Sequence, residues 1–252
     1  MKLPHDEVGT GPAVVLLHAG IADRSMWAEH LGPLAEAGYR VVALDLPGFG
    51  DAPVPPGEQA AWGDVLQTLD ELSIERTTLV GNSFGAAVAL RAAFVAPERV
   101  SALVLISAPA PALEPSPELE AVWEAEETAL ERGDMDTAVD AVVNAWTLPD
   151  APPQLRDRVA AMQRRAFGLQ AEAPATTEAP DPVEQNPDAL ARLDLPTLVA
   201  AGEHDMRDFR DGAEVLARTL PRARHAVIEG AGHLAPLETP EVFRELVLAF
   251  LH

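Results

Sequence analysis

The feature that most constrains the fold is a strand, a short turn and a helix that follow one another directly. Residues Thr78–Val80 form an apolar run typical of a buried strand, and Ala86–Ala96 has the apolar character of a buried helix. A reversal confined to Gly81–Gly85 needs backbone without Cβ atoms beside its centre, and its two glycines supply that. The turn therefore presents Ser83 outward, beside the free N–H groups of the helix, where negative charge is stabilised. The alternative is that Ser83 only caps the helix.

Strands and helices alternate over much of the remaining chain. Short apolar runs predict strands at Pro12–Leu17, Tyr39–Leu44, Arg76–Val80, Val100–Ser107, Pro196–Ala201 and Ala223–Glu229. Helical spacing predicts helices at Ser25–Ala37, Gln59–Leu72, Asp211–Leu220 and Pro240–Leu251. This alternation is typical of an α/β fold with a mostly parallel, doubly wound sheet that helices cover on both faces.

The alternation is interrupted after the fourth predicted strand. Residues Ala108–Pro117 and Ala173–Pro187 are rich in proline, which predicts loops. Between them the spacing predicts helices without a strand: Glu118–Arg132, Met135–Trp146 and Gln154–Gln170. Such an insertion predicts a lid over the carboxyl edge of the sheet, with ordinary peripheral helices as the alternative. We therefore expect a core formed by residues 1–108 and 196–252 and a helical lid formed by residues 109–195.

Charge and composition exclude several classes of function. The chain of 252 residues carries 18 Lys and Arg against 40 Asp and Glu, a net charge of −22, which disfavours nucleic acids and anionic membranes as partners. The same field favours neutral or cationic small molecules as substrates. Cysteine is absent and Lys2 is the only lysine, so thiolate and Schiff-base chemistry have no carrier. We expect a cytoplasmic protein that uses no cofactor and no metal, and the oligomeric state stays open.

A nucleophilic serine requires a base, and histidine is the side chain whose pKa suits that task near neutral pH. Among seven histidines, His233 lies just past the last predicted strand, at the edge where parallel sheets gather catalytic groups. The others include His5, His30 and His252, which we expect at a terminus or on a solvated helix face. His233 is therefore the candidate base.

A carboxylate must in turn orient the histidine and stabilise its charged form. Asp205 follows the predicted strand Thr197–Ala201 directly, at the same edge of the sheet as His233. Its rivals are Asp208 and Asp211, which we expect in the following loop and at the start of the next helix. Asp205 is therefore the candidate orienting carboxylate.

Gly81-Asn82-Ser83-Phe84-Gly85 in its strand-turn-helix context resembles the nucleophile elbow of the α/β-hydrolase fold family. The order Ser83, Asp205, His233 is the order of the catalytic triad in that family, and Trp27 and the segment Asp45–Gly50 extend the resemblance. The chain is similar to small carboxylesterases, 3-oxoadipate enol-lactonases and cofactor-free haloperoxidases or perhydrolases. One departure is that few residues precede the first strong strand, so we expect the antiparallel opening strand of the family to be shortened or absent.

The resemblance also implies an oxyanion hole. Phe84, which follows the nucleophile, would lend one backbone N–H. Gly20 in His18-Ala19-Gly20 matches the residue that lends the other, although Ala19 stands where glycine is usual and Ile21 is an alternative donor. We expect His18 itself to be a structural hydrogen-bonding residue.

These motifs lead us to expect a serine hydrolase that cleaves a carboxylic ester or lactone through an acyl-Ser83 intermediate. Ser83 stands where haloalkane dehalogenases and epoxide hydrolases of the family carry aspartate, and no glycine-rich run typical of C–C hydrolases follows His18. A C–C hydrolase or lyase using the same triad remains an alternative, as does a non-catalytic binding module. For a small, mainly apolar substrate the candidate contacts are Met26, Trp27, Trp123, Trp146, Met162, Phe167 and Leu234.

Overall fold

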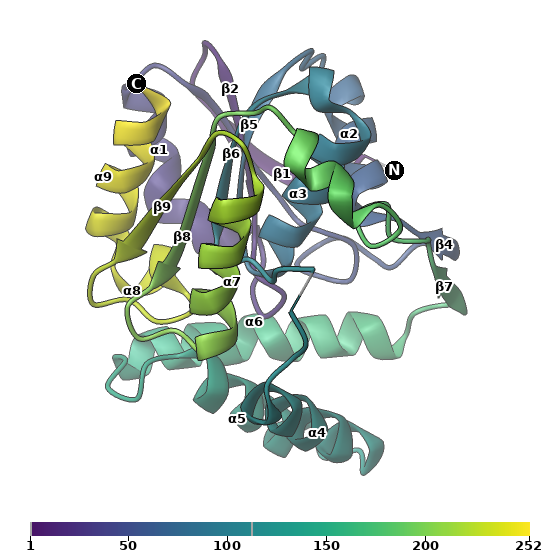
Figure 1. Ribbon diagram of the computed structural model, residues 1–252. Coiled ribbons are helices and arrows are strands. Elements are labelled where there is room, and N and C mark those ends of the chain that lie inside the picture. Colours follow the sequence, from purple (N-terminus) through teal and green to yellow (C-terminus); the bar gives the residue numbers. More distant parts are fainter. Residues whose placement is uncertain (1, 112) are drawn as a thin grey trace.

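The computed structural model describes residues 2–111 and 113–252, and a central sheet organises them (Figure 1). Seven strands lie in the order β1-β3-β2-β5-β6-β8-β9, and all neighbours after the β1·β3 pair are parallel. The strands are β1 His5–Val8, β2 Ala13–Leu17, β3 Arg40–Leu44, β5 Thr77–Asn82, β6 Val100–Ile106, β8 Thr197–Gly202 and β9 Ala223–Ile228. The predicted α/β class with a mostly parallel sheet is confirmed.

The opening strand was expected to be either shortened or absent, and the structure shows that it is not absent. Strand β1 is present and antiparallel to β3, with His5 opposite Leu44 and Val8 opposite Val41. It has four residues, so the short segment before β2 is long enough to form it.

Helices cover both faces of the sheet, because successive strand residues point to opposite sides. Val15 and Leu17 belong to the apolar cluster that contains α2, α3 and α7, whereas Val14 and Leu16 belong to the cluster that contains α1 and α9. Figure 1 shows α1 and α9 on one side of the strands and α2 and α3 on the other. The helices of this part are η1 Arg24–Trp27, α1 Ala28–Glu36, α2 Ala61–Glu71, α3 Phe84–Val95, η2 Pro97–Arg99, α7 Arg207–Thr219, α8 Ala235–Glu238 and α9 Pro240–Leu251.

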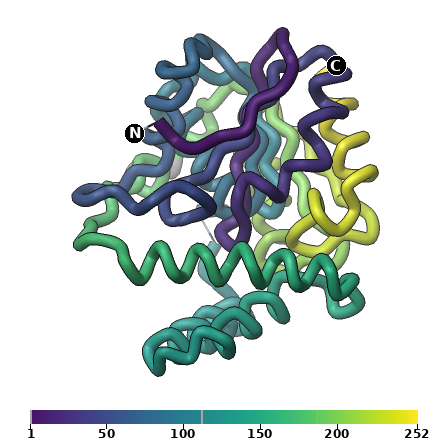
Figure 2. Tube along the Cα trace, turned by 180° about the vertical axis from the view of Figure 1, so that it is seen from behind, coloured from purple at the N-terminus to yellow at the C-terminus, as the bar shows by residue number. Residues whose placement is uncertain are grey.

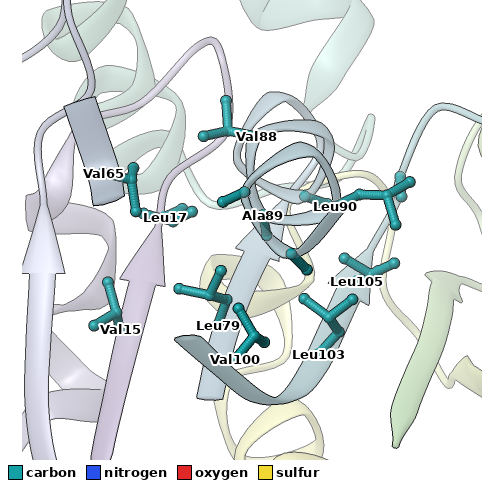
Figure 3. Packing of buried hydrophobic residues seen from close by; sticks show 14 of the residues in the cluster. Val15, Leu17, Val65, Leu79, Val88, Ala89, Leu90, Val100, Leu103 and Leu105 are labelled. Carbon is teal, nitrogen blue, oxygen red and sulfur yellow. The ribbon is translucent and has the colours of Figure 1, made fainter. Parts of the chain in front are cut away.

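Helix α3 is apolar on almost every side because it lies in the middle of one of these layers. Figure 3 shows Val88, Ala89 and Leu90 of α3 beside Leu79 of β5 and Leu105 of β6. Fully burying a Leu or Val side chain stabilises a fold by about 1.5–3 kcal/mol. The helix that starts at the predicted turn is thus fixed on the strands that flank it.

A layer of three helices lies across the carboxyl ends of the strands (Figures 1 and 2). These helices, α4 Pro117–Glu131, α5 Met135–Trp146 and α6 Pro153–Ala171, connect β6 to β8 and are called the helical layer below. Side-chain caps explain two of their starts, since Ser116 accepts a hydrogen bond from Leu119 N and Asp134 accepts one from Thr137 N. The observed bounds agree closely with the predicted helices.

Three local predictions were wrong. Gln59, which we expected in a helix, belongs to β4 Gly57–Gln59, and β4 pairs in parallel with β7 Thr176–Glu178, inside a segment predicted to be a loop. The end of that segment enters the short helix η3 Pro187–Arg192. Helix α7 begins at Arg207, so Asp208 lies in its first turn rather than in a loop.

Within the described residues no helix is both long enough and apolar enough to cross a bilayer.

Candidate active site

The turn after β5 has the strained geometry that its glycines predict. Ser83 has φ +53° and ψ −115°, a conformation that is rare for a residue with a side chain. A Cβ on Gly81 would lie 2.3 Å from Gly85 O, and a Cβ on Gly85 would lie 2.2 Å from Leu17 O. Because only glycine fits at both positions, the helix can start immediately after Ser83, with the serine half-exposed at its N-terminus.

The strand order reverses at the neighbouring pair β2 and β5, where ligands of such sheets bind. The loop after β2 carries Gly20 and the turn after β5 carries Phe84. A Cβ on Gly20 would lie 3.3 Å from Phe84 Cβ, so the two backbones approach closely. Both residues line the same cavity as Ser83, which is the arrangement that an oxyanion hole requires.

His233 and Asp205 meet beside this point. His233 Nδ1 lies 2.9 Å from Asp205 Oδ1, which also accepts a hydrogen bond of 2.8 Å from Met206 N. An ionised carboxylate can only accept, so the proton of a neutral His233 is assigned to Nδ1 and Nε2 is left as the basic nitrogen. Both residues are 5% exposed, which keeps water away from their hydrogen bond.

The loops that carry these two residues are fastened to each other. A Cβ on Gly202 would lie 2.1 Å from Gly232 O. His204 N donates to Ala231 O at 2.8 Å, and Glu203 Oε2 accepts from Gly230 N at 3.0 Å. The relative position of Asp205 and His233 is therefore set by the backbone of both loops.

Two aromatic rings enclose the imidazole. The ring centroids of Trp146, from α5, and Phe209, from α7, each lie 4.4 Å from that of His233. Phe209 was not a candidate from the sequence, because nothing in its helical spacing indicates contact with a loop after another strand. Trp146 brings the helical layer into direct contact with the candidate base.

Ser83 and His233 line a cavity of about 450 Å³ between the sheet edge and the helical layer. Among the described residues, no hydrogen bond joins Ser83 Oγ to the His233 ring. Catalytic hydrogen bonds of this kind often shorten only when substrate is bound. The remaining wall is mainly apolar: Gly20, Ile21, Phe84, Ala87, Pro109, Ala110, Leu113, Glu114, Pro115, Leu119, Trp123, Glu126, Trp146, Gln163, Asp208 and Phe209.

Of the predicted substrate contacts, Trp123 and Trp146 lie in this wall. The other five are buried in the apolar cluster that joins the helical layer to the sheet and do not line the cavity: Met26, Trp27, Met162, Phe167 and Leu234. Apolar spacing identified these side chains as inward-facing but could not separate the core from the cavity wall. The cavity wall therefore does not include these five residues, and their contact with a substrate stays a prediction.

His18 has the structural role that we expected, and Asp45 has a structural role in the neighbouring loop. His18 is fully buried; its Nδ1 lies 2.7 Å from Ala19 O and its Nε2 accepts from Leu46 N at 2.9 Å. Because Nε2 accepts a hydrogen bond it carries no proton, which makes the ring neutral, and burial lowers the pKa of His18. Asp45 accepts hydrogen bonds from Arg24 N and Asp51 N, both at 2.7 Å, and holds the loop after β3.

His30 corrects another expectation, because it does not lie on a solvated helix face. Its ring is fully buried between Trp27 and Phe243, and its Nε2 donates to Pro236 O at 2.8 Å. Burial lowers the pKa of His30. The histidine thus ties α1 to α8.

Two residues near the triad escaped the sequence prediction. Asn82 Nδ2 donates to His233 O at 3.1 Å and so links the serine turn to the histidine loop. Glu238 accepts backbone hydrogen bonds from Gly232 N (2.8 Å) and Leu234 N (3.2 Å), on both sides of His233, and from Leu148 N (3.0 Å), just after α5. Burial raises the pKa of Glu238 in spite of these donors. The sequence shows that Glu238 lies five residues after His233, but it does not show that Glu238 accepts a hydrogen bond from Leu148 N.

The rivals of Asp205 are engaged elsewhere. Asp208 accepts hydrogen bonds of 2.7 Å from both Ser116 N and Ser116 Oγ, and Asp211 pairs with Arg207 on the surface of α7. Within residues 2–111 and 113–252, no group of three or more His, Asp or Glu side chains is placed to hold a metal ion.

Fold and site together define a hydrolase. Residues 12–240 match the model of the alpha/beta hydrolase fold, and the chain belongs to this family. It is 30% identical to the 2-hydroxy-6-oxononadienedioate/2-hydroxy-6-oxononatrienedioate hydrolase of Cupriavidus pinatubonensis, over 98% of this chain and 89% of that protein. The chain spans only 33–35% of the length of two epoxide hydrolases of Siraitia grosvenorii that it matches at 39–40% identity.

Solved structures give the same classification. A thermophilic esterase from Thermogutta terrifontis superposes with a TM-score of 0.79 at 28% identity, covering 99% of this chain and 92% of the esterase. The enol-lactonase from Burkholderia xenovorans LB400 superposes with a TM-score of 0.82 at 25% identity, covering 99% and 96%. The predicted resemblance to the α/β-hydrolase family is confirmed.

Proposed function

We propose that the protein is a serine hydrolase that cleaves a carboxylic ester or lactone of a small, mainly apolar substrate through an acyl-Ser83 intermediate. The observation that carries the proposal is the hydrogen bond between His233 Nδ1 and Asp205 Oδ1 at a cavity that Ser83 also lines. The esterase and enol-lactonase among the solved neighbours support the same class of reaction.

In the proposed reaction, Ser83 Oγ attacks the carbonyl carbon while His233 Nε2 takes its proton, and Asp205 stabilises the imidazolium. His233 then gives this proton to the leaving alcohol. Water, activated by His233, adds to the acyl group and releases the acid and free Ser83. Phe84 N–H and Gly20 N–H, with Ile21 N–H as the other candidate, donate to the oxyanion of both tetrahedral intermediates.

We assign residues 1–108 and 196–252 to the catalytic core and residues 109–195 to a lid. The assignment is supported by the position of the helical layer across the carboxyl edge and by the contact of Trp146 with His233. A lid in this place would exclude water from the acyl-enzyme until the alcohol has left.

C–C bond hydrolysis is the second candidate, favoured by the full-length similarity to a dienedioate hydrolase. A dienedioate carries two carboxylates, and cationic side chains are the usual partners of such groups. None of the described residues that line the cavity is Lys or Arg, whereas three are acidic. This lining favours an ester or lactone over a dianion.

The deciding experiment is hydrolysis of p-nitrophenyl butyrate by wild type and by Ser83→Ala. We expect kcat to fall about 10³-fold or more, because the nucleophile is lost. Ser73→Ala is the matched control, since Ser73 has φ 54° like Ser83 but is an exposed residue outside the cavity lining. Wild-type turnover by Ser83→Ala would refute the proposal. A wild-type protein that neither hydrolyses esters nor reacts with a fluorophosphonate would instead be a binding module.

A further inference from the structure

The cavity wall contains polar side chains that the proposed reaction does not use. The acidic ones are Glu114, Glu126 and Asp208, and the amide of Gln163 accompanies them. Asp208 holds Ser116 through two hydrogen bonds, and Glu114 is exposed in the loop before α4. Glu126 and Gln163 are therefore the two groups that lack a structural explanation.

Glu126 extends from α4 into the wall without a partner. It forms no hydrogen bond and no ion pair with another described residue, and its carboxyl is only partly exposed. Burial alone raises the pKa of Glu126, with no nearby cation to oppose it. A desolvated carboxyl at an apolar cavity is unfavourable unless something that enters the cavity pairs with it.

Gln163 on α6 provides a second and independent observation. The residue is 2% exposed, and its Oε1 is buried without any hydrogen-bond partner, although the side chain lines the cavity. Buried amide oxygens in native proteins nearly always accept a hydrogen bond. The amide of Gln163 therefore has hydrogen-bonding capacity that no described residue uses and that a ligand in the cavity can take up.

We propose that Glu126 and Gln163 recognise the substrate, and that this substrate is an ester bearing a protonated amine. Glu126 pairs with the positive charge, and the amide of Gln163 forms a hydrogen bond with the ligand. Trp123 and Trp146 supply aromatic faces on which an alkylammonium group binds favourably. The net charge of −22 attracts such a cation to the protein. This inference rests on the proposed esterase function.

The test compares three isosteric esters: 3-(dimethylamino)propyl butyrate, which is cationic, 4-methylpentyl butyrate, which is neutral, and 3-carboxypropyl butyrate, which is anionic. A second set carries the same groups on the acyl side, because either half of an ester could face Glu126. We expect kcat/KM in one set to be about tenfold higher for the cation than for the neutral ester, the ratio of a charge pair worth about 1.4 kcal/mol. The anion should be the poorest substrate.

Variants separate the pocket from the overall charge of the protein. Glu126→Gln should reduce the cation-to-neutral ratio to about one, whereas Glu127→Gln, on the exposed neighbour in α4, should leave the ratio unchanged. An equal decrease in both variants would assign the preference to the general field. A ratio of one in wild type would overturn the proposal.

Gln163→Leu should raise the stability of the protein and lower its selectivity, a combination that a purely structural role of Gln163 would not produce. Loss of a buried unpaired acceptor should raise Tm by about 2–4 °C. The same variant should lower kcat/KM for the dimethylammonium ester severalfold. A fall in Tm with unchanged selectivity would contradict a role in binding.

Ligand binding keeps this inference separate from the proposed reaction. Ketone analogues of the cationic and neutral esters are added to Ser83→Ala, and the Tm increase is measured. A larger increase with the cationic ketone would support the recognition site even if no ester were hydrolysed. Hydrolysis of the neutral ester without any charge preference would overturn this inference alone.

Discussion

The sheet edge and the helical layer are built in opposite ways. At the sheet edge, the loops that carry Asp205 and His233 approach so closely that a Cβ on Gly202 would lie 2.1 Å from Gly232 O. In the helical layer, Trp123 is 49% exposed and Gln163 Oε1 has no partner. We infer from this contrast that the sheet edge would fix the geometry of the proposed reaction and that the layer would bind the substrate. Substitutions at the edge should therefore change kcat, and those in the layer should change KM or selectivity.

The strongest test of the sheet edge is Asp205→Asn. We expect kcat for p-nitrophenyl butyrate to fall about 10⁴-fold, because an amide in place of the carboxylate leaves His233 with the wrong tautomer. Asp211→Asn, on the surface of α7, is the control and should retain wild-type kcat. A loss below tenfold in Asp205→Asn would show that this edge does not set the rate.

Glu238→Gln examines a carboxylate that holds the histidine loop and the end of α5 together. The amide keeps a single acceptor oxygen for three backbone donors, so we expect about a tenfold lower kcat through a misplaced His233, a barrier increase of about 1.4 kcal/mol. The pH dependence of kcat should also change, since a carboxyl whose pKa is raised by burial is removed. Glu241→Gln on α9 is the control. An unchanged pH profile would reduce Glu238 to a structural role.

Acid should destabilise the fold through the part outside residues 109–195, because that segment contains no histidine and both buried histidines of interest lie elsewhere. Burial lowers the pKa of His18 and of His30 below the ordinary 6.5, so at lower pH the unfolded chain binds protons that the folded chain does not. The free energy of unfolding should therefore fall as pH decreases below about 6.5, by up to about 1.4 kcal/mol per pH unit for each histidine. Urea unfolding of His30→Gln should show a slope smaller by about one proton. An identical slope of unfolding free energy against pH in wild type and His30→Gln would contradict a lowered pKa of His30.

The smallest effect is expected in the layer. Trp123→Ala should raise KM about threefold with kcat unchanged, because a half-exposed wall residue contributes to binding in the ground state and transition state alike. Leu130→Ala, an exposed residue of the same helix, is the control. A tenfold change in kcat with Trp123→Ala would remove the distinction between the two regions.

The same contrast explains what could be predicted from the sequence. Ser83, Asp205 and His233 could be predicted because each lies within five residues after the end of a strand, and the carboxyl ends of parallel strands share an edge. Glu238 was not, because its partner Leu148 lies 90 residues away. Met26 and Trp27 lie in the apolar cluster rather than in the cavity wall, because helical spacing shows which face is buried but not whether core or cavity lies beneath it. The prediction that His30 is solvated was wrong for a related reason, because only tertiary packing buries its ring.

The hydrogen bond from Leu148 to Glu238 also limits how the cavity can open. One carboxylate fastens the end of α5 to the loop of His233, so any swing of the helices that preserved this bond would pivot there. The start of α4 is held as well, because Asp208 of α7 accepts two hydrogen bonds from Ser116, so a movement that preserved all of these bonds would leave both ends of the α4–α5 pair attached to the sheet.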